Sequence, residues 1–97
     1  MSWDAPLESD IEDYLVRECR KRGALCYKFT APGRRSVPDR IVLLPGGRTF
    51  FVECKRPGGK PTRLQQQEHE KLRQQGFAVH LVDTRREVDR VIAVEEV

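Results

Sequence analysis

The sequence predicts an α/β domain in which a mixed β-sheet carries helices on its faces. Three observations support this prediction. Apolar residues recur with helical spacing near both ends of the chain. Short β-rich runs flank a Pro-Gly-Gly turn, and another stretch with helical spacing separates the last two β-rich runs. The expected order is α-β-β-β-α-β-α. A hairpin joins antiparallel strands and a strand-helix-strand crossover joins parallel ones, so the sheet should be mixed.

The first expected helix runs from about Pro6 to Arg22 and ends at Gly23, a plausible C-terminal cap. On a helical wheel Glu8 falls in one narrow sector with apolar Leu15 and Cys19, an unusual place for an acidic residue. A strand from Leu25 to Thr30 follows, and the Pro, Gly and polar residues at 31–36 indicate a loop.

Two β-rich runs, 39–44 and 48–55, surround the turn at 45–47. Strand alternation places Glu53 and Lys55 on the same face. A three-residue turn with Gly47 in the left-handed region would pair Asp39 with Glu53, with Cβ atoms roughly 5 Å apart. A two-residue turn would send the Asp39 side chain to the other face. We expect the three-residue register, or a bulge with the same result.

The remaining elements are a helix from about Thr62 to Gln75, a strand over 77–82 and a helix from Thr84. Thr62 and Gln65 have the spacing of a capping box, and Gly76 ends the first of these helices. With 97 residues the chain has room for one domain, spanning residues 1–97.

Composition narrows the functional classes. Apolar runs fall well short of the ~20 residues of a spanning helix, and no secretory signal is evident, so we expect a cytoplasmic protein (in a bacterium, or in the host if phage-encoded) without a membrane partner. The three cysteines form no C-x-x-C pair, which argues against a disulfide framework or a zinc site. The net charge of +3 is compatible with a nucleic-acid partner without requiring one.

Basic residues concentrate in the middle of the chain around two carboxylates, Asp39 and Glu53. Those we expect to contact DNA phosphates are Arg34, Arg35, Arg40, Arg56, Lys60 and Arg63. The two carboxylates should repel each other unless a cation lies between them. Oxygen ligands favour Mg²⁺ or Mn²⁺, which would polarise a phosphate and activate a bound water. Lys55 would orient that water or neutralise charge on the phosphorus centre.

These residues resemble a known signature. Pro38-Asp39 followed by Glu53-Cys54-Lys55 is similar to the PD-(D/E)XK nuclease motif. With the Glu8-x-x-Ile11-Glu12 helix, the 32–40 loop, and Pro61-Thr62-x-Leu64-Gln65, nearly the whole chain looks like a stand-alone VRR-NUC domain. One departure is Ser36, where relatives often carry glycine; serine suits the loop unless the backbone there needs a positive φ.

The resemblance implies a restriction-endonuclease-like fold and a set of roles. Asp39, Glu53 and the Cys54 backbone carbonyl would bind the metal, and Lys55 would be the catalytic lysine. Glu8 would complete the site, directly or through water, with Glu12 as the alternative if the helix is rotated. Gln65 would support the site from its helix, although the capping box alone could explain it.

Other polar and aromatic residues have simpler interpretations. We interpret His69 as a helix-surface residue and His80 as a strand residue with its polar atoms satisfied, because neither has metal-ligand spacing. Trp3 and Tyr27 could stack on bases, but packing in the core or tail is the favoured interpretation.

The predicted function is a Mg²⁺-dependent DNA endonuclease. A two-fold-symmetric substrate needs two sites, which favours a homodimer acting on branched, four-way-junction-like DNA. The alternatives are a flap nuclease, a restriction-type nuclease, and a non-catalytic nucleic-acid-binding module. Restriction-type recognition would need more elements for base readout than 97 residues provide. Loss of a carboxylate or the lysine would be expected in a non-catalytic module, and this chain retains all of them.

Overall fold

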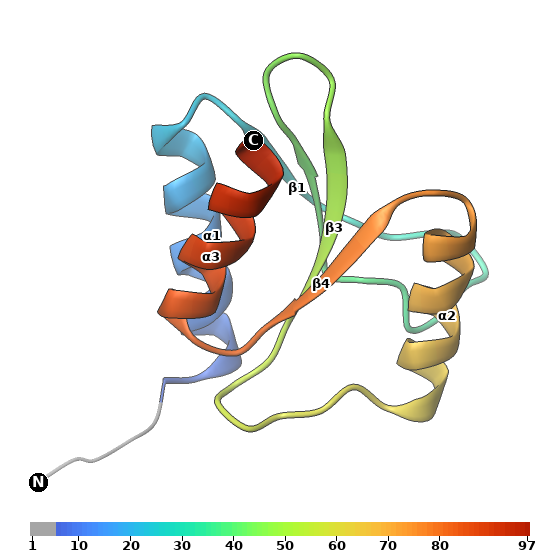
Figure 1. Cartoon of the computed structure of the whole chain (residues 1–97). Coiled ribbons are helices and arrows are strands. Elements are labelled where there is room, and N and C mark those ends of the chain that lie inside the picture. Colours follow the sequence, from blue (N-terminus) through green and yellow to red (C-terminus); the bar gives the residue numbers. More distant parts are fainter. Residues whose placement is uncertain (1–5) are drawn as a thin grey trace, which may run out of the picture.

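Seven elements follow one another in the predicted order (Figure 1). The computed structural model describes residues 6–97. The elements are α1 (Glu8–Lys21), β1 (Leu25–Lys28), β2 (Arg40–Leu43), β3 (Thr49–Cys54), α2 (Arg63–Gln74), β4 (Ala78–Val82) and α3 (Arg85–Glu96). Within the described residues, no helix combines the length and the apolar character needed to cross a bilayer.

The four strands form one mixed sheet in the order β1-β2-β3-β4. β1, β2 and β3 are antiparallel neighbours, whereas β4 runs parallel to β3 after the crossover through α2. In Figure 1, α1 and α3 lie side by side against one side of the sheet and α2 lies on the other. We call these sides the two-helix face and the one-helix face. The predicted mixed sheet with helices on both faces is confirmed.

The main hydrophobic core lies on the two-helix face. Ile11, Leu15 and Cys19 from α1 are almost inaccessible to solvent and pack with Val42, Phe50 and Val52 of the sheet and with the apolar side of α3. Their i, i+4 spacing is what places the three α1 side chains on one stripe. Glu8, predicted to share that stripe, is exposed instead, because it is the first residue of the helix.

The hairpin between β2 and β3 has the three-residue register predicted from the sequence. The Leu44 N–H donates to the Arg48 carbonyl at 2.8 Å, and Gly47 has a φ of 96°, as the turn requires. The ladder continues to Arg40 opposite Val52, so the next pair outward is Asp39 opposite Glu53. Both side chains therefore point to the one-helix face.

The expected element ends differ from the observed ones by at most two residues. The first helix begins at Glu8 because Leu7 has the extended backbone of an N-cap. β1 ends at Lys28, although the Phe29 N–H still donates to the Asp39 carbonyl at 2.9 Å. That last bond anchors the 29–38 loop beside Asp39.

Candidate active site

The candidate site lies on the one-helix face, where β2 begins and β3 ends. Asp39 reaches across the hairpin, and its Oδ2 accepts a hydrogen bond of 2.8 Å from the Cys54 backbone N–H. This bond holds the Asp39 carboxylate at the end of β3, one residue beyond Glu53. The hairpin register thus supplies two neighbouring carboxylates.

Glu53 is the centre of the site and is only 2% exposed. Its Oε2 lies 3.5 Å from the Lys55 ammonium, two residues along the same face. The Gln65 side-chain amide of α2 donates to the same oxygen at 3.3 Å. Lys55 and Gln65 therefore both lie beside Glu53, as the sequence predicted.

Gln65 makes the capping contacts and the site contact at once. Its backbone N–H donates to the Thr62 hydroxyl at 3.1 Å, and its Oε1 accepts from the Thr62 N–H at 2.9 Å. The Nε2 end of the same amide faces Glu53. The capping role and the site role of Gln65, both left open by the sequence, are therefore compatible. The capping contacts at the start of α2 fix which end of the Gln65 amide faces Glu53.

His69 is buried, not on the helix surface, and this corrects the sequence interpretation. It is 3% exposed, and its Nε2 lies 3.5 Å from Glu53 Oε1. One helical turn after Gln65, it shares the side of α2 that faces the sheet. The i, i+4 spacing of Gln65 and His69, followed by Leu72, is the signal that could have identified it. His80 is satisfied as expected, with Nε2 2.6 Å from Glu95 Oε2.

Two buried polar atoms in this cluster lack a hydrogen-bond partner among the described residues: Glu53 Oε1 and His69 Nε2. Such an atom carries an uncompensated desolvation cost. An unpartnered carboxylate oxygen beside a second carboxylate is a suitable ligand position for a hard cation. Within residues 6–97, no group of three or more His, Cys, Asp or Glu side chains could hold a metal by itself. Two neighbouring carboxylates, Asp39 and Glu53, are oxygen ligands of the kind that suits Mg²⁺, an ion that retains several waters.

The electrostatics of Asp39 also fit a cation site. Burial raises the pKa of Asp39 to about 6; the hydrogen bond from Cys54 opposes this rise, and the negative charges of Glu53, Glu12 and Glu8 reinforce it. Carboxylates that lack a compensating positive charge hold their protons more tightly. A divalent ion between Asp39 and Glu53 would reverse that effect.

The two acidic candidates of α1 differ in their environments. Glu12 is already paired, with Arg40 Nε at 2.7 Å and Lys28 Nζ at 3.3 Å. Glu8 is exposed and lies close enough to raise the pKa of Asp39. Glu8 is therefore the α1 carboxylate with greater freedom to face the site.

The predicted DNA-contacting residues do not all lie together. Arg40 points to the two-helix face, as alternation after Asp39 requires, and its guanidinium is held by Glu12. Arg34 is exposed and lies 3.4 Å from Glu68 of α2. The other four, Arg35, Arg56, Lys60 and Arg63, are exposed on the loops and the helix start that surround the site.

Two further expectations concern the loop and the aromatic residues. Ser36 has a φ of 68° and is, within residues 6–97, the one residue other than glycine with a positive φ. This is the backbone condition under which glycine would be favoured, and it costs serine about 1 kcal/mol. Tyr27 is 53% exposed on the one-helix face, so the core interpretation is wrong for it. Trp3 lies outside the described residues.

Comparisons with known proteins bear on the fold and the family of the chain. No protein-family model matches the chain. Nuclease p44 of Acyrthosiphon pisum secondary endosymbiont phage 1 is 53% identical over 77 residues, which cover 79% of this chain and 83% of that protein. A solved structure described as a VRR_NUC domain superposes with a TM-score of 0.83 at 34% identity, covering 89% of this chain and 94% of the other. The restriction-endonuclease-like arrangement of helices and strands agrees with that superposition, and the chain belongs to the VRR-NUC family of nucleases.

Proposed function

We propose that this protein is a divalent-metal-dependent endonuclease that hydrolyses phosphodiester bonds in DNA. The observation that carries the proposal is the placement of Asp39 opposite Glu53 on one face of the sheet, with the Lys55 ammonium 3.5 Å from Glu53. Asp39, Glu53 and the Cys54 carbonyl would hold Mg²⁺ or Mn²⁺, and Glu8 would complete the site through water. The ion, when bound, supplies charge for the phosphate and lowers the pKa of a water.

The protein's own side chains have separate tasks in this reaction. A water oxygen attacks phosphorus, the bond to one deoxyribose oxygen breaks, and that leaving oxygen takes up a proton. The Lys55 ammonium neutralises charge that develops on the phosphate oxygens. Gln65 fixes the Glu53 carboxylate through the 3.3 Å hydrogen bond, and Asp39 is fixed by the Cys54 N–H. Exposed Arg35, Arg56, Lys60 and Arg63 provide phosphate contacts around this centre.

We further propose that the substrate is branched DNA and that the active form is a homodimer. One compact site cuts one strand, so symmetric cutting of a four-way junction requires two copies related by a two-fold axis. Flap cutting and restriction-type cutting are the enzymatic alternatives, and binding without chemistry is the alternative from another class.

The test compares a four-way junction, a flap and a linear duplex, each with and without Mg²⁺ or Mn²⁺. Lys55→Ala should retain metal-free DNA binding and lose about a hundredfold or more in cutting rate. Lys21→Ala is the matched control, because Lys21 lies in the last turn of α1 and contacts Glu18. Binding of all three DNAs without cutting under either metal would reject the enzyme. Light scattering of the free protein and of its junction complex tests the dimer.

A further inference from the structure

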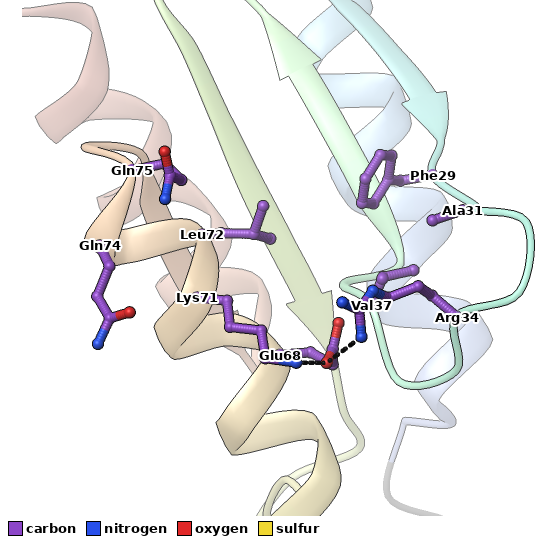
Figure 2. Close-up of a pocket in the computed structure, with 9 residues that line it drawn as sticks. All are labelled: Phe29, Ala31, Arg34, Val37, Glu68, Lys71, Leu72, Gln74 and Gln75. Carbon is purple, nitrogen blue, oxygen red and sulfur yellow. Dashed lines mark hydrogen bonds and ion pairs between the residues drawn. The ribbon is translucent and has the colours of Figure 1, made fainter.

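A pocket of about 390 Å³ lies beside the candidate site, between α2 and the loop that connects β1 to β2. Figure 2 shows Leu72 and Glu68 of α2 on one side of it, and Phe29, Ala31, Arg34 and Val37 on the other. The volume falls within the range of roughly 300–1,000 Å³ that is typical of small-molecule sites. The pocket can therefore hold one planar, nucleobase-sized group.

Its lining combines an apolar interior with a charged rim. Phe29, Val37 and Leu72 supply apolar surface, and the Phe29 ring is held by the ring of Phe51, with centroids 5.0 Å apart. At the rim, Glu68 Oε2 lies 2.8 Å from the Lys71 ammonium and 3.4 Å from the Arg34 guanidinium. Two cations around one carboxylate leave this rim with a net positive charge, which suits an anionic backbone.

Both walls of the pocket are continuous with the candidate site. The Phe29 N–H donates to the Asp39 carbonyl at 2.9 Å, so the loop wall begins beside one proposed metal ligand. Glu68 immediately precedes His69, which lies 3.5 Å from the other, Glu53. A DNA strand whose phosphate lies at the site would thus have a neighbouring nucleotide within reach of the pocket.

We propose that this pocket receives one unstacked base of the DNA strand that is cut. The proposal rests on the function proposed above and adds a way for the protein to select its substrate. A base can pack on the Phe29 ring and the apolar wall, its amino group can donate to Glu68, and Arg34 and Lys71 face the adjoining phosphates. Extruding a base costs least where it is already unpaired. The pocket therefore favours DNA in which pairing is interrupted, as it is at a branch point.

The test uses Ala31→Leu, which fills the pocket from its loop wall while Asp39, Glu53 and Lys55 stay unchanged. Gln75→Trp fills it from the end of α2, because the indole ring is larger than the glutamine side chain that lines the pocket. The matched control is Ala93→Leu, because Ala93 is exposed on α3, across the sheet. Thermal unfolding of all four proteins shows which variants are folded. Binding is measured without metal by fluorescence anisotropy, using a branched DNA in which one abasic nucleotide is moved stepwise across the branch.

At one position the abasic nucleotide should weaken binding to the wild type and to Ala93→Leu by about tenfold. Ala31→Leu and Gln75→Trp should bind the intact DNA with a similar loss and show no further loss at that position. The proposal is overturned if no position is sensitive, or if the filled variants keep the sensitivity of the wild type. If this happens while the wild type still cuts DNA, the nuclease function stands without the pocket. A wild-type protein that binds no DNA rejects both proposals.

Discussion

The two faces of the sheet each bury a glutamate beside a histidine, and the two pairs differ in how well they are satisfied. On the two-helix face, Glu95 lies 2.6 Å from His80 and 2.9 Å from Arg48, so both of its oxygens have partners. On the one-helix face, Glu53 shares one oxygen between Gln65 and Lys55, and its other oxygen has no hydrogen bond among the described residues. A satisfied buried carboxylate serves the fold, whereas an unsatisfied one is available for a ligand.

The largest difference between the two pairs should appear in catalysis. Glu53→Gln keeps the side-chain shape but removes the charge proposed to hold the metal, and should lower the cutting rate by about a thousandfold or more. Glu95→Gln should cut at close to the wild-type rate at temperatures where it is folded. Single-turnover cutting of the preferred DNA with Mg²⁺ measures both. Equal losses in the two variants would remove the functional distinction between the faces.

For the free energy of unfolding we expect the opposite order, with Glu95→Gln losing more than Glu53→Gln. Burial would raise the pKa of Glu95, but the hydrogen bonds from His80 and Arg48 outweigh it and lower that pKa. The resulting stabilisation is present above the usual carboxylate range and is lost as the pH falls through the lowered pKa. Glu95→Gln should therefore cost about 2 kcal/mol at pH 7, and the difference from wild type should shrink towards pH 3. Urea unfolding across this pH range measures this difference. Glu53→Gln is the comparison and should lose little free energy of unfolding.

Asp39 should destabilise the metal-free protein at neutral pH. Its pKa of about 6 lies above that of the unfolded chain, so the folded state binds more protons between about pH 4 and 6. Stability due to Asp39 therefore falls as the pH rises through this window, and the cost is fully present above about pH 6. Asp39→Asn should be more stable than wild type by about 1 kcal/mol at pH 7.5, after allowance for solvent screening.

The metal-free difference between Asp39→Asn and wild type should be absent near pH 4, as thermal unfolding can show. Addition of Mg²⁺ or Mn²⁺ should raise the melting temperature of the wild type more than that of the variant. Equal stabilisation of both proteins by the cation would mean that the cation binds away from Asp39.

Among the effects on cutting rate, the smaller one concerns His69, which we expect to act through Glu53 as a positioning residue. His69→Ala should lower the cutting rate about tenfold, with little change in metal-free DNA affinity. His69→Gln, whose amide nitrogen can take the place of Nε2, should recover part of that rate. His80→Ala is the matched control on the other face and should affect stability more than cutting. A rate loss that Gln does not recover, accompanied by equal loss of DNA affinity, would indicate a merely structural role.

The sequence predicts best those features that depend on residues close together in the chain, such as turns and strand alternation. The turn at 45–47 and the alternation of β3 were enough to pair Asp39 with Glu53, because hairpin length sets register. The burial of His69 does not follow from local patterns, because it depends on how α2 packs and rotates against the sheet. Charge alone places Arg40 among the predicted DNA-contacting residues, whereas strand alternation after Asp39 directs its side chain to the opposite face. The pocket beside Phe29 was likewise outside the reach of sequence patterns, since it depends on how far the 29–37 loop lies from α2.

The shared use of Gln65 links the proposed chemistry to the local unfolding of a helix. The side chain that closes the first turn of α2 also donates to Glu53, so fraying of that turn would break the Gln65–Glu53 hydrogen bond in the same event. The opening free energy of one helical turn thus sets the fraction of molecules in which Gln65 holds the Glu53 carboxylate. Hydrogen exchange at the Gln65 backbone amide reports that opening directly, and DNA or metal that engages the assembled site should slow it.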